Sequence, residues 1–297
     1  MNRFVFMLIL AVAGGLTARA DEKRPIVVCS TTQVADFARQ VVGDRWQVIS
    51  ILAPGQDPHL YDTKPGDAAL VASSQLCLDN GWHLEGKDWM RRLATAAGKP
   101  IVSCVTGLQP LELEEGEEKV HDPHAWFSPK NAAVYVRNIA KAVAKADPSH
   151  ADEYDARAKL YLEQLRVLNQ WILSQLSEIP AGKRMLITSH DAFNYFCRDF
   201  RFTATTPRGW STGEEIGGGA TEKRMRETIA AVRESGVKAI FVETSVNDDL
   251  IRTIADQAGV KIGGTLYSDS MGVPGSAGET YLGMMRENVI TIVESLK

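Results

Sequence analysis

The chain has 297 residues, an apolar share of 44% and a formal net charge of −4 at pH 7. This apolar share is ordinary for a globular protein, and the sequence contains no repeat and no low-complexity tract. The negative charge argues against nucleic acid as a partner, because proteins that bind it carry an excess of Lys and Arg to neutralise phosphates. The length suits two globular units of roughly 100–150 residues each.

The first twenty residues have the pattern of a secretory signal peptide. Arg3 supplies a positive charge, Phe4–Leu16 an apolar run and Ala18–Ala20 a small-residue cleavage motif. The apolar run is too short to span a bilayer core of about 30 Å, and no cysteine follows it to carry a lipid. We therefore expect residues 1–20 to be a signal peptide cleaved after Ala20, and the mature protein to be soluble in a periplasm.

Apolar runs and amphipathic segments alternate through the first half of the chain. The expected strands are Pro25–Ser30, Gln47–Leu52, Leu76–Asn80 and Pro100–Cys104. The expected helices between them are Gln33–Val42, Asp67–Ser73 and Asp88–Ala97. This alternation is typical of an α/β fold with a parallel sheet flanked by helices. Leu111–Val120 interrupts it with five glutamates; we expect a solvated acidic loop, with a role in attracting cations as the alternative.

Two helices are expected next, over Pro129–Ala146 and over Ser149–Ile179. At a rise of about 1.5 Å per residue the second would be about 45 Å long, enough for a stiff strut between two α/β halves. Beyond it, the expected strands are Met185–Thr188, Phe202–Thr205, Ala239–Val242 and Lys261–Gly263. The expected helices are Ala192–Phe200, Glu222–Glu234, Asp248–Ala258 and Gly278–Leu296. We expect an N-terminal unit over 21–148, a linking helix over 149–180 and a C-terminal unit over 181–297.

Two further features narrow the possible chemistry. Thr212–Thr221 is rich in glycine but lacks the Lys-Ser/Thr ending of a phosphate-binding loop, so a surface loop is expected. The four cysteines, none in a Cys-x-x-Cys pair, are Cys29, Cys77, Cys104 and Cys197. Export would permit disulfides, but three of the cysteines lie in apolar, strand-like runs, which favours buried free thiols. A zinc site made of thiolates is not indicated.

Three of the six histidines lie in short turn-forming motifs. His59 and His124 each follow Asp-Pro, and His190 lies in Ser-His-Asp directly after an expected strand. Proline restricts its own φ and the residue before it, so the two Asp-Pro-His turns are pre-shaped. Neutral imidazole is the commonest protein ligand for zinc and similar ions. With Asp269, which follows the last expected strand, these residues fall at the carboxyl ends of strands or beside them, where open parallel sheets bind ligands.

These motifs resemble the zinc- and manganese-binding receptors of bacterial ABC importers, the TroA-like family of periplasmic solute-binding proteins. The segments that carry the resemblance are Pro54–His59, Asp122–Pro129, Ser189–Phe196, Phe241–Asn247 and Leu266–Ser270. The resemblance covers nearly the whole mature chain. It implies two α/β lobes joined by one long helix, with a metal ion between them held by His59, His124, His190 and Asp269. It also implies a monomer, without catalytic residues, that delivers the ion to a membrane permease with its ATPase.

The identity of the metal is left open by the resemblance. Manganese-type members usually have glutamate where His190 stands, and zinc-type members often carry a long histidine-rich loop before the second ligand, which Leu111–Val120 does not match. Three imidazoles and one carboxylate suit Zn²⁺, whereas Mn²⁺ prefers more oxygen ligands. We expect zinc first and manganese second, with iron or another ion after them. Glu243 has two interpretations: it orients a ligand histidine, or it pairs with a cation such as Arg208.

Two other functions are alternatives to capture of a metal ion. A zinc hydrolase would need three ligands and an activated water, with Glu243 as the base. Asp269 takes the fourth position in the expected ligand set, and no His-Glu-x-x-His motif is present. A receptor for a bulky iron chelate predicts an open aromatic cleft without a histidine cluster.

Overall fold

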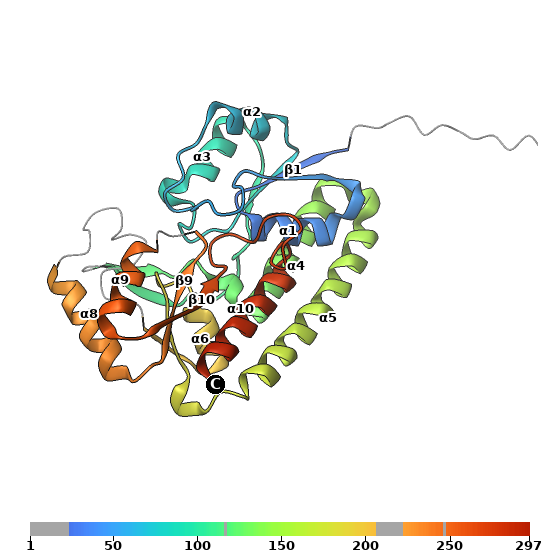
Figure 1. The fold of residues 1–297 in the computed structure, drawn as a ribbon. Helices are drawn as coiled ribbons and strands as arrows, with labels where there is room; N and C mark the ends of the chain where they lie inside the picture. The colour runs from blue at the N-terminus through green and yellow to red at the C-terminus, as the bar shows by residue number, and fades with distance from the viewer. Residues whose placement is uncertain (1–23, 116–117, 206–221, 246–247) are drawn as a thin grey trace, which may run out of the picture.

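The computed structural model describes residues 24–115, 118–205, 222–245 and 248–297 (Figure 1). The expected signal peptide, the glycine-rich loop Thr212–Thr221 and Arg208 lie outside these ranges. For orientation, residues 24–146 are called the N-terminal half below, and residues from 181 onward the C-terminal half.

The N-terminal half contains a parallel sheet of four strands in the order β2-β1-β3-β4. Its strands are β1 (Ile26–Cys29), β2 (Gln47–Ser50), β3 (Leu76–Asp79) and β4 (Ile101–Ser103). Successive side chains of β1 enter different cores: Val27 and Cys29 belong to the main core, and Val28 to a smaller one with Val71 and Met90. This is the alternation of a strand covered on both faces.

Three helices pack around this sheet, namely α1 (Thr32–Val42), α2 (Pro65–Ser73) and α3 (Trp89–Ala96). The helix α1 begins where the Thr31 hydroxyl accepts a hydrogen bond from the Val34 N–H, a side-chain cap for an otherwise unpaired donor. It ends at Gly43, whose φ of 53° is easily adopted only by glycine. The start of α1 therefore lies at the carboxyl end of β1.

The long helix α5 (Ala151–Leu176) has 26 residues and a length of about 39 Å. It is shorter than expected because a 3-10 turn, η4 (Pro148–His150), precedes it and its last turn ends at Leu176. Its buried residues recur at helical spacing: Tyr154, Ala158, Tyr161, Leu165, Leu168, Ile172 and Leu176. They pack α5 against α1 and α4 (Pro129–Ala146) of one half and α10 (Tyr281–Leu296) of the other (Figure 1).

The C-terminal half contains two pairs of parallel strands. One pair is β7 (Met185–Ile187) with β8 (Thr203–Thr205), and the other is β9 (Ala239–Glu243) with β10 (Lys261–Leu266). The helices are α6 (Asn194–Phe200), α8 (Glu222–Ser235) and α9 (Asp249–Ala258), besides α10. The strand β10 is longer than expected, since it continues to Leu266 after an irregularity between Ile262 and Gly264. The α/β class with parallel sheets flanked by helices is confirmed.

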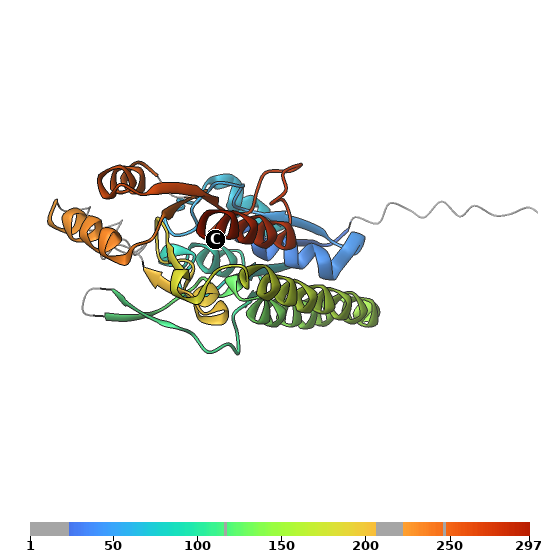
Figure 2. The ribbon, with the colours of Figure 1, turned by 60° about the horizontal axis from the view of Figure 1, so that its bottom comes forward.

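The expectation of a loop over Leu111–Val120 is wrong. The segment forms an antiparallel hairpin of β5 (Glu112–Glu115) and β6 (Glu118–His121), which projects from the body of the protein (Figure 2). Leu113 lies opposite Val120, and Lys119 forms an ion pair of 2.9 Å with Glu112. An apolar pair and opposite charges across the strands favour this pairing despite the glutamates.

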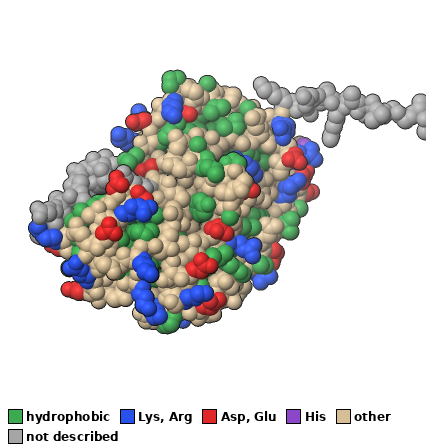
Figure 3. Space-filling view, in the orientation of Figure 1, with side chains coloured by type: hydrophobic (Ala, Val, Ile, Leu, Met, Phe, Trp, Pro, Cys, Tyr) green, Lys and Arg blue, Asp and Glu red, His purple; other side chains and the backbone are tan. Residues whose placement is uncertain are grey.

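Other features of the described chain agree with the sequence. All four cysteines are free and buried. On the face shown in Figure 3, acidic and basic side chains are interspersed without a large field of one sign. No helix in the described ranges is both long enough and apolar enough to cross a membrane.

Candidate metal centre

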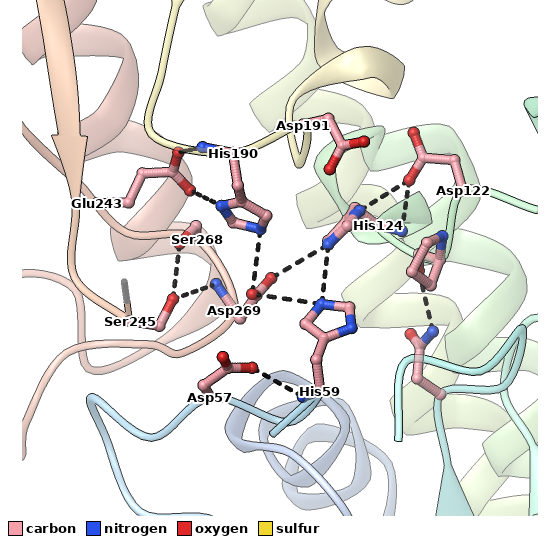
Figure 4. Close-up of polar contacts among 12 residues, drawn as sticks. Asp57, His59, Asp122, His124, His190, Asp191, Glu243, Ser245, Ser268 and Asp269 are labelled. Atoms are coloured by element: carbon pink, nitrogen blue, oxygen red, sulfur yellow. Dashed lines mark hydrogen bonds and ion pairs between the residues drawn. The ribbon is translucent and has the colours of Figure 1, made fainter. Parts of the chain in front are cut away.

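The structure brings together the four side chains that the sequence singled out. One ligand atom from each of His59, His124, His190 and Asp269 lies within 4.8 Å of all the others (Figure 4). The Nε2 atoms of His59 and His124 are 3.3 Å apart. The Asp269 carboxylate lies 3.2 Å from Nε2 of His190 and 3.5 Å from Nε2 of both His59 and His124. No second such group of three or more His, Cys, Asp or Glu side chains occurs within the described ranges.

His59 is positioned by the turn that follows β2. Its backbone N–H donates to Oδ1 of Asp57 at 2.7 Å, and the indole of Trp89 donates to the carbonyl of Pro58 at 2.9 Å. Gly86 lies directly against this turn: a Cβ atom added there would be 2.0 Å from the His59 carbonyl oxygen. The turn is therefore held by its own Asp-Pro sequence and by close packing on one glycine.

His124 is oriented by the aspartate two residues before it. Oδ1 of Asp122 accepts the His124 backbone N–H at 2.9 Å and lies 2.8 Å from ring Nδ1. The other oxygen, Oδ2, accepts a hydrogen bond of 3.1 Å from the amide of Asn194 in the C-terminal half. Because Nδ1 faces a carboxylate, the lone pair of Nε2 is directed toward the cluster.

His190 is oriented in the same way, but by a residue distant in sequence. Oε1 of Glu243 accepts the His190 backbone N–H at 2.9 Å, and Oε2 lies 2.7 Å from ring Nδ1. Glu243 ends β9 and is buried. Of its two expected interpretations, the one in which it orients a histidine agrees with these contacts; the other partner, Arg208, lies outside the described residues.

Asp269 lies on the loop after β10. Its backbone N–H donates to the hydroxyl of Ser245 at 3.3 Å, and that hydroxyl is 2.8 Å from the hydroxyl of Ser268. Ser268, Asp269 and Ser270 are all buried. The carboxylate therefore faces the imidazoles from a loop with little access to solvent.

The electrostatics of the cluster are dominated by these buried opposite charges. Burial alone would raise the pKa of Asp269, but the neighbouring imidazoles, His190 foremost, hold it well below its ordinary value. Burial alone would lower the pKa of His190, yet the carboxylates of Glu243 and Asp269 raise it well above the ordinary value. For His124 the pKa is raised too, since Asp122 and Asp269 outweigh burial. The site thus combines nitrogen donors with carboxylates that stabilise a positive charge at its centre.

The remaining histidines do not join this cluster. His121 ends β6, and its ring lies 5.9 Å from that of Trp82. His83 is exposed and pairs with Asp88 at 3.3 Å, and His150 pairs with Asp147 at 2.8 Å. Trp126 lines the cluster instead, with its buried ring 5.4 Å from that of His124.

Comparisons with known proteins agree with this fold. The family model of the periplasmic component A of zinc-uptake complexes, ZnuA, matches residues 27–295. The manganese-binding lipoprotein MntA of Bacillus subtilis is 36% identical over 278 residues, covering 91% of this chain and 89% of that protein. The zinc-binding protein TroA of Treponema pallidum is 34% identical over 292 residues, covering 95% and 92%. The iron-binding protein YfeA of Yersinia pestis is 33% identical over 271 residues, covering 90% and 85%.

Solved structures show the same relationship. The periplasmic zinc-binding protein TroA of Treponema pallidum superimposes with a TM-score of 0.84 at 31% identity, covering 92% of this chain and 99% of that one. A manganese-bound periplasmic metal-binding protein from Candidatus Liberibacter asiaticus gives 0.81 at 29% identity, covering 92% and 100%. The fold and site therefore define a metal-binding transport receptor and not an enzyme, so the hydrolase alternative is set aside. The chain belongs to the ZnuA family.

Proposed function

We propose that this protein captures one divalent transition-metal ion with His59, His124, His190 and Asp269, and delivers it to the permease of an ABC importer and its ATPase. The observation that carries the proposal is the convergence of three Nε2 atoms and one carboxylate within 4.8 Å. Buried carboxylates behind two of the imidazoles add to it, because such partners fix the ring and raise its basicity as a ligand.

Zinc is the ion we favour. Three nitrogens and one oxygen suit tetrahedral Zn²⁺, and zinc binds such donors more tightly than manganese does. Manganese is the second candidate, and one observation favours it: both oxygens of Asp269 face the cluster, Oδ1 toward His124 and Oδ2 toward His190. A bidentate carboxylate would supply the additional oxygen that Mn²⁺ prefers. The relatives described above are named for binding manganese, zinc and iron, so all three ions are candidates.

The architecture proposed for delivery has an N-terminal unit over 21–148, the linking helix over 149–180 and a C-terminal unit over 181–297. His59 and His124 belong to the first unit, and His190 and Asp269 to the last. Because α5 packs against helices of both halves, it opposes a wide hinge motion. Release would then require only the displacement of a few ligands. We further propose export by cleavage after Ala20 and a soluble, monomeric periplasmic form.

Elemental analysis of protein purified without added metal, followed by competition between zinc and manganese, tests the identity of the ion. The ligand set is tested by calorimetry on His59→Ala, His124→Ala and His190→Ala. Each should lower zinc affinity by more than about 100-fold, beyond the loss typical of a residue that only supports a ligand. His83→Ala is the control, since this exposed side chain lies outside the cluster. Unchanged affinity in all three variants would refute the ligand set.

A further inference from the structure

The loop that carries Asp269 is held from the other half of the molecule. The side-chain amide of Gln33 donates to the carbonyl of Ser268 at 3.0 Å. The backbone N–H of Met271 donates to the hydroxyl of Thr32 at 2.9 Å. Asp269 lies between these two anchored positions, so a pair of residues at the start of α1 spans the segment that presents the carboxylate.

The two anchors support each other. The Thr32 hydroxyl, which accepts from Met271, donates in turn to Oε1 of Gln33 at 3.1 Å. With its oxygen occupied in this way, the Gln33 amide has its nitrogen directed at the Ser268 carbonyl. The hydrogen bonds therefore form one connected clamp, defined here as Thr32 and Gln33 bound to Ser268 and Met271.

The burial of Gln33 indicates that its amide is present for its hydrogen bonds and not only for packing. Gln33 is 1% exposed, in a helix that also buries the apolar side chains of Val34 and Phe37. Burying an amide costs free energy unless it is hydrogen-bonded, whereas an apolar side chain would avoid that cost. Within its own half, the Asp269 peptide has only the longer 3.3 Å contact to Ser245. The Gly55 N–H, in the loop that leads to His59, donates to the Ser270 hydroxyl at 2.7 Å and links the Asp269 loop to the N-terminal half, as Gln33 does.

We propose that Thr32 and Gln33 are positioning residues for metal capture, which keep Asp269 aligned with His59 and His124 across the interface between the halves. This inference rests on the proposed function. The clamp ties the segment that carries the carboxylate to the start of α1, so a small displacement of that loop from α1 would move Asp269 away from His59 and His124. Because Asp269 is the oxygen donor of the set, loosening it should weaken manganese binding more than zinc binding.

The test uses two variants that remove hydrogen bonds with little change of shape, Gln33→Met and Thr32→Val. Thr32→Ser retains the hydroxyl and serves as the rescue. Gln40→Met is the matched control in the same helix, since its amide donates to Asp36 and not to the Asp269 loop. The measurements are the rate of zinc release to a chelator, the separate affinities for zinc and manganese, the absorption spectrum of the cobalt-loaded protein, and the melting temperature without metal.

We expect Gln33→Met and Thr32→Val to release zinc about 10-fold faster, within the range for residues that support a ligand. The ratio of zinc to manganese affinity should rise and the cobalt spectrum should change. Thr32→Ser and Gln40→Met should behave like the unmodified protein. Wild-type release rates, or an unchanged affinity ratio, in Thr32→Val and Gln33→Met would overturn the clamp. If Gln33→Met does not fold, the Thr32→Val and Thr32→Ser pair decides.

Asp269→Asn, measured in parallel, separates this inference from the proposed function. If it weakens metal binding while the clamp variants do not, only the clamp is refuted. If it leaves binding unchanged, Asp269 is not a ligand, and the failure lies in the proposed ligand set.

Discussion

Glu243 contacts His190 with both oxygens of its carboxylate, one at the backbone N–H (2.9 Å) and one at ring Nδ1 (2.7 Å). The first contact holds the main chain just beyond β7, and the second holds the imidazole. Together they determine where Nε2 points, so Glu243 acts on the candidate metal centre through His190 and not as a ligand itself.

Removing the charge of this carboxylate should weaken metal binding. We expect Glu243→Gln to lower zinc affinity about 10-fold to 100-fold, because the imidazole loses its anionic partner and its fixed orientation. Calorimetric titration measures the change. Glu234→Gln, an exposed position on α8, is the control and should leave affinity unaltered. Equal affinities for the two variants would contradict the role assigned to Glu243.

The stabilisation that zinc confers should increase with pH. In the metal-free protein, the raised pKa values of His190 and His124 mean that their charged forms stabilise the fold. That stability is complete below the unfolded-state pKa of about 6.5 and is lost as pH rises through the higher folded-state values. Zinc binding has the opposite dependence, since each imidazole must lose its proton to act as a ligand.

Melting temperatures with and without zinc, measured from about pH 5 to about pH 8.5, test this dependence around the ordinary histidine pKa of about 6.5. The difference between them should widen steadily with pH and continue to widen above 6.5, because the folded-state pKa of His190 is raised. The lowered pKa of Asp269 keeps its carboxylate charged over this range, so its stabilising contribution should be constant there. A difference that does not vary with pH would argue against histidine ligation.

A methyl group at Gly86 should displace the turn that carries His59. The added Cβ would lie 2.0 Å from the carbonyl oxygen of His59 and 3.0 Å from its carbonyl carbon, and backbone atoms cannot move aside as a flexible side chain can. We expect Gly86→Ala to lower the free energy of unfolding by about 1–3 kcal/mol and to weaken zinc binding. Gly66→Ala, where nothing lies within 4 Å of the added atom, is the matched control. Zinc titrations that cannot distinguish the two variants would show that the turn tolerates displacement.

The packing of α5 can be tested at two adjacent residues. Ile172 is fully buried, whereas Leu173 is 45% exposed. Ile172→Ala should lower the free energy of unfolding by about 2–5 kcal/mol, because it leaves a cavity in the core. Leu173→Ala should change it by no more than about 0.5 kcal/mol. Denaturant unfolding measures both, and similar losses would mean that this face of α5 does not pack as described.

Much of the site could be predicted because its signals are local in sequence. The Asp-Pro-His turns shape their own backbone, and Asp122 is two residues from the ring that it orients. Strand and helix periodicity placed His190 and Asp269 at the ends of strands. The hairpin over Glu112–His121 was missed because its segment contains five glutamates, which are poor strand formers. The cross-strand contacts that favour the pairing become visible only in the structure.

Apart from the hairpin of β5 and β6, the sequence by itself determined the order of strands and helices, the turns that present the histidines and the buried stripe of α5, since each depends on neighbouring residues. Only the tertiary structure decided which distant groups meet. Glu243 reaches His190 across 53 positions, and Gln33 reaches Ser268 across 235. No local preference encodes these contacts. They exist because the shared core of α1, α4, α5 and α10 fixes one half against the other, and a hydrogen bond forms only when both partners are held within about 3 Å.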